Sequence, residues 1–107
     1  MSRSIIVLTK RMAKKYQEGF VKKYTGELSH SVLGFRGYIN AESFYNELGH
    51  TIRPLDLVTL SKWNSKEDWT RWLESEKRRN INKKFKEYLE KETHEILYKI
   101  CYEVPLL

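Results

Sequence analysis

The hydrophobic pattern of this chain switches repeatedly between two periods, and the order of the switches limits the folds open to it. Apolar residues that alternate with polar ones predict a half-buried strand, whereas apolar residues three or four positions apart predict an amphipathic helix. Residues 4–9 are apolar and β-branched, and they predict a first strand that is buried on both faces or nearly so. Further strands are predicted at 33–40, 57–63 and 96–104.

Three segments between these strands have the helical period. The first spans about 11–30 and the third about 79–91. The second, at 66–75, follows Ser65, whose hydroxyl oxygen can accept a free backbone N–H of the first helical turn. Residues 41–55 fit either a short helix or an extension of the second strand.

The resulting order, β-α-β-β-α-(α)-β, is that of the ferredoxin-like split βαβ fold. It predicts one α+β domain over residues 1–107, with a four-stranded antiparallel sheet and helices on one face. The other face of such a sheet would present apolar side chains that need a cover. A second copy of the same sheet would supply that cover, so we expect a homodimer.

Charge and cysteine content narrow the class of protein. The chain has 20 Lys and Arg against 14 Asp and Glu, but its basic residues alternate with glutamates along 83–92, which is typical of a solvated helix face. We therefore expect no nucleic-acid partner, although binding through this basic charge is a rival hypothesis. Cys101 is the only cysteine, which favours a reducing compartment. No apolar run is long enough for a signal peptide or a membrane span, so we expect a cytoplasmic protein with no membrane partner.

Few residues suggest a particular chemistry. His30, His50 and His94 lack the spacing of metal ligands, so no metal site is predicted. There is no nucleophile elbow, phosphate-binding glycine loop or pair of carboxylates. Trp69 and Trp72 lie three residues apart on one predicted helix, and they fit either core packing or stacking on a flat ligand.

Several stretches together resemble the antibiotic biosynthesis monooxygenase family. They cover the opening of the first helix, a Gly-Phe-x-Gly second strand, and a strand-ending Trp followed by a Ser helix cap and two aromatic residues three positions apart. These stretches are residues 8–10, 13–15, 19–20, 34–37 and 63–75. The resemblance extends over nearly the whole chain except 41–55. It implies a dimeric α+β barrel with a pocket between the sheet and the helices of each subunit.

The same resemblance implies two kinds of activity. Some family members oxygenate polycyclic aromatic substrates without metal or cofactor, and others bind and degrade haem with O₂. The haem-degrading branch is the nearest. Matched by position, its helix Trp falls on Trp72, its first-strand Asn on Ser4 and its iron-ligating His on Asn82. An asparagine cannot replace imidazole as the haem ligand, so the usual iron ligation of that branch is not predicted.

Six residues are therefore candidates for a site. Trp72, Asn82 and Ser4 are the catalytic candidates, and the last two could donate hydrogen bonds to a substrate carbonyl or to peroxide. The ligand-binding candidates are Trp69, Arg36 and Tyr38. For most of these side chains, ordinary core packing or solvent exposure is the alternative.

The function expected is that of a dimeric monooxygenase-type protein that binds a flat aromatic ligand near Trp72 without a cofactor. One alternative is a haem-binding or haem-degrading protein with altered iron ligation. Another is a non-catalytic dimeric binding module whose pocket has closed. The sequence leaves open whether any reaction is catalysed.

Overall fold

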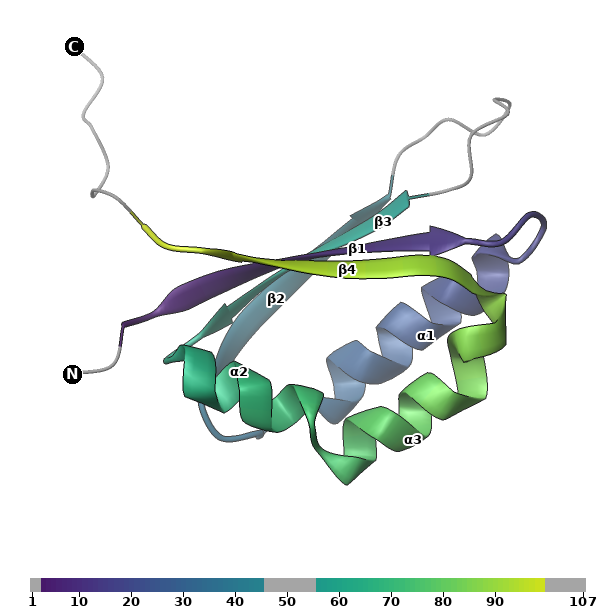
Figure 1. Ribbon diagram of the computed structural model, residues 1–107. Helices are drawn as coiled ribbons and strands as arrows, with labels where there is room; N and C mark the ends of the chain where they lie inside the picture. The colour runs from purple at the N-terminus through teal and green to yellow at the C-terminus, as the bar shows by residue number, and fades with distance from the viewer. Residues whose placement is uncertain (1–2, 46–55, 100–107) are drawn as a thin grey trace, which may run out of the picture.

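The computed structural model describes residues 3–45 and 56–99, and these form one four-stranded antiparallel sheet with helices on one face (Figure 1). The predicted ferredoxin-like α+β order is confirmed, and the strands lie in the order β2-β3-β1-β4. In chain order the elements are β1 (Ile5–Ala13), α1 (Glu18–Ser31), β2 (Tyr38–Tyr45), β3 (Asp56–Trp63), α2 (Lys66–Leu73), α3 (Glu76–Phe85), the short 3₁₀ helix η1 (Lys86–Tyr88) and β4 (Leu89–Leu97).

β1 is a central strand, and its side chains alternate between the helix layer and the opposite face. Ile5 and Val7 are buried beneath the helices, whereas Ile6 between them is 37% exposed. The prediction that this strand is buried on both faces is therefore wrong for the single chain. The helices cover only one face of the sheet (Figure 1). The main hydrophobic core lies on that covered face and consists of Ile5, Val7, Tyr24, Leu28, Val32, Trp63, Trp72, Ile81 and Phe85.

The first helix begins later than predicted because β1 continues to Ala13. Arg11 and Ala13 have the same parity as Ile5 in the strand alternation, and both are buried. The helical spacing expected from residue 11 is therefore wrong for its first residues. A turn that contains Tyr16 with a φ of 66° leads into α1 at Glu18.

The second strand also begins later than predicted, at Tyr38 rather than at residue 33. Gly34 and Gly37 have φ angles of +80° and +87°, which lie outside the strand region, so the chain turns here. Phe35 is part of this turn and packs against the core. Tyr38, the first residue of β2, packs against the same core. A regular strand from residue 33 would place Phe35 and Tyr38 on opposite faces, and the turn brings them to the same side.

The backbone at Gly37 comes very close to α2. A β-carbon at this position would overlap the side chain of Asp68 on α2. The backbone carbonyl of Gly37 also accepts a 2.8 Å hydrogen bond from the backbone N–H of Asn64. Gly37 therefore lets the turn before β2 pack directly against the start of α2.

The last strand was predicted too late in the chain. β4 spans Leu89–Leu97, and α3 ends at Phe85 instead of continuing to residue 91. The expectations for 46–55 and for 100–107, which include His50 and Cys101, lie outside the described residues. Within 3–45 and 56–99, no helix is long and apolar enough to cross a membrane.

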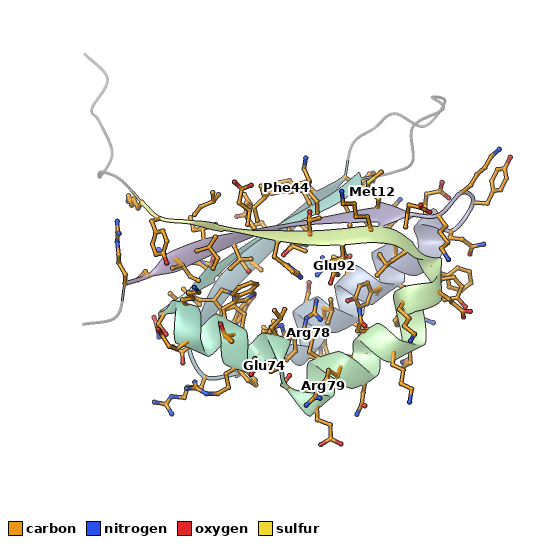
Figure 2. The ribbon with its side chains drawn as sticks, in the orientation of Figure 1. Met12, Phe44, Glu74, Arg78, Arg79 and Glu92 are labelled. Carbon is orange, nitrogen blue, oxygen red and sulfur yellow. The ribbon has the colours of Figure 1, made fainter. Side chains whose placement is uncertain are left out.

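The face of the sheet opposite the helices carries exposed apolar side chains. We call it the outer face and define it by Ile6, Phe44, Leu60 and Leu97, which are 36–49% exposed. Strand pairing brings Ile6 beside Leu97 and Leu60 beside Leu8, so the apolar side chains are neighbours across strands. Phe44 points away from the helices in Figure 2.

Candidate functional site

A cavity of about 50 Å³ lies between the sheet and the helices. Its residues come from β1, β2, β3, β4 and all three α-helices, so it is formed only in the folded chain. One water molecule needs about 10–15 Å³ on this measure, so the cavity has room for a few water-sized groups.

Three tryptophans and Tyr38 form the aromatic part of the cavity wall. Trp72 is 6% exposed and meets Phe35 edge-to-face, with ring centroids 5.1 Å apart. Trp69 meets His94 in the same way at 5.6 Å, and Trp63 meets Tyr38 at 5.4 Å.

The start of α2 sets the direction of two of these tryptophans. The Ser65 hydroxyl accepts a 3.1 Å hydrogen bond from the backbone N–H of Asp68, which confirms the predicted helix cap. From that start, Trp69 and Trp72 lie three residues apart on one side of α2 and reach the cavity. The cap therefore fixes where the aromatic wall begins.

A row of polar side chains crosses the sheet beneath the cavity. Thr9 pairs with Thr59 on one side and with His94 on the other, so all three lie in line on the covered face. The Thr9 hydroxyl lies 2.9 Å from Nδ1 of His94, and the Thr59 hydroxyl lies 2.8 Å from that of Ser43. These hydroxyl groups supply donors and acceptors opposite the tryptophans.

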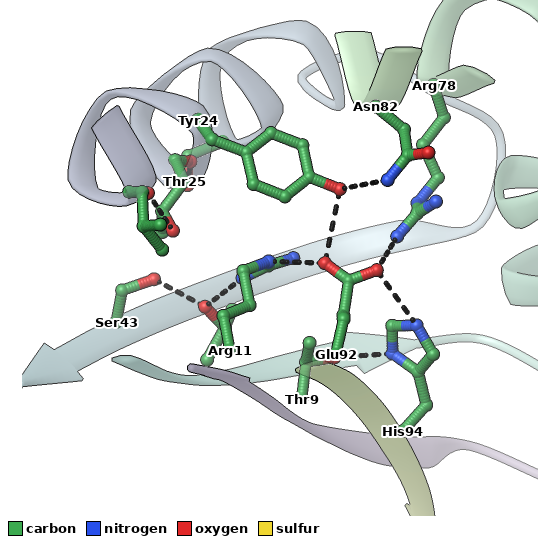
Figure 3. Close-up of polar contacts among 12 residues, drawn as sticks. Thr9, Arg11, Tyr24, Thr25, Ser43, Arg78, Asn82, Glu92 and His94 are labelled. Atoms are coloured by element: carbon green, nitrogen blue, oxygen red, sulfur yellow. Dashed lines mark hydrogen bonds and ion pairs between the residues drawn. The ribbon is translucent and has the colours of Figure 1, made fainter. Parts of the chain in front are cut away.

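Glu92 on β4 lies at the centre of a buried polar network beside this row (Figure 3). Arg11 Nε donates to its Oε2 at 2.7 Å, and Arg78 Nη2 donates to its Oε1 at 2.8 Å. The Tyr24 hydroxyl donates to Oε2 at 3.1 Å, and His94 Nε2 lies 3.4 Å from Oε1. The network thereby joins β1, β4, α1 and α3.

The ionisation of this network follows from its contacts. Burial alone would raise the pKa of Glu92, but hydrogen bonding with His94 and the positive charges of Arg11 and Arg78 outweigh burial and hold that pKa below its usual range. Burial raises the pKa of Tyr24, and the negative charge of Glu92 raises it further. Glu92 is therefore an anion near neutral pH, and Tyr24 remains a neutral donor.

The structure brings three of the six candidate residues to the cavity. Trp72, Trp69 and Tyr38 are part of its wall. Asn82 lies behind the wall, where its side-chain amide donates a 3.1 Å hydrogen bond to the Tyr24 hydroxyl.

The other two candidates, Ser4 and Arg36, are exposed, and neither lines the cavity. The structure therefore does not bring them together with the tryptophans. The roles in catalysis and ligand binding assigned to all six residues stay predictions.

The charged side chains of the site were missed by sequence reasoning. The sequence pattern predicts a helix at Arg11 and a solvated helix face at Glu92, and it does not single out Arg78. The alternation of the first strand could have revealed Arg11. Thr9 and Arg11 lie an even number of residues after the buried Ile5, so they point to the same covered face.

The donor set of the cavity does not fit haem. The side-chain amide of Asn82, the residue that the resemblance matches to the haem ligand, donates its hydrogen bond to the Tyr24 hydroxyl. Both ring nitrogens of His94 already face protein partners, Thr9 and Glu92. Within the described part of the chain, no group of three or more His, Cys, Asp or Glu side chains could hold a metal ion.

The fold is shared with several solved structures. SnoaB, a cofactor-independent oxygenase from Streptomyces nogalater, is similar over 98% of this chain and 100% of that chain, with a TM-score of 0.76 and 8% identity. A candidate antibiotic biosynthesis monooxygenase from Nitrosomonas europaea is similar over 94% of this chain and 93% of its own, with a TM-score of 0.75 and 11% identity. A conserved protein from Methanosarcina mazei Go1 is similar over 91% and 93%, with a TM-score of 0.75 and 21% identity.

These likenesses define a class by fold: this chain has the fold of antibiotic biosynthesis monooxygenase-like proteins, as the sequence resemblance predicted. No protein-family model matches the sequence, and comparison with curated proteins gave no match. One fold can host different activities, so the function must be argued from the cavity itself.

Proposed function

We propose that this protein is a dimeric monooxygenase of the antibiotic biosynthesis type, which binds a flat aromatic molecule in the cavity beside Trp72. The observation that best supports this proposal is the composition of the cavity wall. Three indole rings lie on it together with a row of hydroxyl groups on the sheet. Flat apolar walls with a few placed polar groups are typical of sites for aromatic ligands.

A polycyclic ligand needs more room than the cavity of about 50 Å³ offers. Trp69 is only half-buried and lies on α2, a helix of eight residues. We expect α2 to move outward when a ligand enters, so that the indole of Trp69 closes over the ligand ring. The hydroxyl groups of Thr9 and Thr59 would then face the edge of the ligand.

The reaction that this site would support needs no electron donor besides the substrate. In an anthrone, a ring methylene that is conjugated through the aromatic rings with a carbonyl group can lose a proton, and the resulting carbanion can reduce O₂ directly. One oxygen atom becomes a new ring carbonyl, and the other leaves as water with the two methylene hydrogens. Hydrogen-bond donors that face the substrate oxygen stabilise the enolate form of the carbanion. SnoaB, which shares the fold, is a cofactor-independent oxygenase. Haem chemistry is not part of the proposal because the donor set does not suit the iron.

Oxygen uptake with an anthrone tests this activity. We expect consumption of one O₂ for each quinone formed, at a rate that falls at least tenfold in Trp72→Phe because the stacking surface changes. Asn82→Ala tests the catalytic role predicted for Asn82 in the same assay. Tyr16→Phe, at a side chain that is 81% exposed, is the matched control and should keep the rate. Absence of enzyme-dependent uptake with a panel of anthrones and quinols would contradict the proposed activity.

A second copy of the chain is proposed as the cover for the outer face. Ile6, Phe44, Leu60 and Leu97 expose apolar side chains on a sheet whose other side is already packed. Sheet-to-sheet contact between two copies would remove these side chains from water through one symmetric interface.

A further inference from the structure

The cavity wall carries an excess of positive charge. Arg11 and Arg78 line it, and none of the residues that line it is an aspartate or a glutamate. Glu92, the carboxylate that joins the two arginines, lies behind the wall rather than on it. Figure 3 shows both guanidinium groups bound to the carboxylate of Glu92. A ligand in the cavity would therefore meet cationic groups first.

This charge is buried and only partly neutralised. The side chains of Arg11 and Arg78 are 6% and 9% exposed, and they share the single carboxylate of Glu92. Two guanidinium charges and one carboxylate leave one formal positive charge. The other groups that face Glu92 are His94 and Tyr24, and neither is an anion. An uncompensated buried charge is costly, and a bound anion would offset that cost.

Among the described residues, both guanidinium groups also have N–H donors for which no acceptor is present. Each guanidinium has five N–H donors. Among the described residues, the Arg78 side chain donates only from Nη2 to Glu92, and the Arg11 side chain donates from Nε to Glu92 and from Nη1 to Thr59. The planar fork of an arginine matches the two oxygens of a carboxylate.

We propose that the ligand of this cavity is an aromatic carboxylate whose carboxylate group binds to Arg78 and Arg11. The inference rests on the proposed function for the location of the aromatic ring, but it does not need oxygenation to occur. The carboxylate lies on the guanidinium groups, and the ring extends between the row of hydroxyl groups and the indoles of Trp69 and Trp72. A carboxylate occupies little volume, in keeping with the small size of the cavity.

Calorimetric titration with three small molecules tests the charge of the ligand. 2-Naphthoate has both the ring and the carboxylate, 2-naphthamide is its neutral counterpart, and butyrate has only the carboxylate. We expect naphthoate to bind about tenfold or more tightly than naphthamide, as charge-assisted hydrogen bonds should give. In Arg78→Gln this ratio should fall to about one.

The neighbouring arginine is a matched control. Arg79 is exposed on the same helix, and Figure 2 shows it directed away from Glu92. Arg79→Gln should therefore keep the full preference for naphthoate. Should Arg78→Gln fail to fold, Arg78→Lys keeps the charge but loses the fork, and an intermediate ratio is expected. A solely structural role for Arg78 predicts no preference for naphthoate in the wild-type protein.

The other outcomes separate this inference from the proposed function. Equal binding of naphthoate and naphthamide would overturn the anion site and leave the aromatic site in place. Binding of butyrate that depends on Arg78, with neither naphthalene compound bound, would keep the anion site and contradict the aromatic ligand. Failure of all three to bind, or a preference that survives in Arg78→Gln, would overturn the inference.

Discussion

At the scale of single residues, Glu92 connects the covered face of the sheet to two helices. Its two oxygens accept from Arg11 on β1, Arg78 on α3 and Tyr24 on α1. Removing its charge would leave the two guanidinium groups buried without an anion. The polar interior is therefore a source of stability and, in our proposal, of the preference for an anionic ligand.

Glu92→Gln should lower the free energy of unfolding at pH 7 by about 3–5 kcal/mol, the usual effect of breaking a buried ion pair. Because the pKa of Glu92 is lower in the folded chain than in the unfolded one, its contribution is complete above the unfolded value of about 4.3. That contribution shrinks progressively as the pH falls below the unfolded value, and it is gone once the pH is below the folded value. Urea denaturation at pH 7 and pH 3 should show the difference between wild type and variant shrinking at the lower pH.

Glu90→Gln is the matched control for this experiment, since Glu90 is an exposed carboxylate on the same strand. Its effect should stay within about 0.5 kcal/mol. A difference between wild type and Glu92→Gln that is constant with pH would contradict the assigned ionisation.

At the scale of the elements, α2 positions the aromatic wall, and its start depends on one hydroxyl. Ser65 is 5% exposed and accepts from the backbone N–H of Asp68. Its hydroxyl also donates to the Asp68 carboxylate at 3.0 Å. The position of Trp69 and Trp72 follows from this helix start.

Ser65→Ala should lower the free energy of unfolding by about 1–2 kcal/mol, because a buried cap is lost. It should also change the near-ultraviolet circular dichroism of the tryptophans. Thr70→Ala is the control, since the Thr70 hydroxyl bonds only within the exposed turn of α2. An effect of Ser65→Ala no larger than that of Thr70→Ala would count against the cap as the device that orients α2.

Sequence periodicity predicted the elements well where their inward positions are apolar. β3 and α2 were placed to within two residues because Leu57, Trp63 and the Ser65 cap give local signals. β4 was misplaced because its inward positions include Glu92 and His94, and alternating charges resemble a solvated helix. The cavity tryptophans could be predicted from helix spacing, but the charged network could not, since its members are 14 to 81 residues apart in the chain.

At the scale of the whole molecule, we expect the outer face of the sheet to determine whether two copies of the chain associate. Leu60 on β3 is 36% exposed and pairs with Glu42 on the adjacent strand. A lysine at position 60 would be tolerated in the single chain because Glu42 lies beside it. The same lysine would place a charge in the proposed sheet-to-sheet interface.

Sedimentation velocity should therefore give a dimer for the wild type at micromolar concentration and a 12.9 kDa monomer for Leu60→Lys. Leu33→Lys is the control, because Leu33 is 60% exposed and lies outside the sheet. That variant should remain a dimer. A monomeric wild type would contradict the proposed pairing of sheets.

The central claim is that the cavity between the sheet and α2 is the ligand site, and nuclear magnetic resonance tests it most directly. In a ¹⁵N-labelled sample titrated with 2-naphthoate, we predict shifts in the three indole N–H signals and in the backbone amides of Thr9, Thr59 and His94. Signals from residues on the outer face, such as Leu60, should change little. Shifts centred on the outer face, or unchanged indole signals at saturating ligand, would contradict the account.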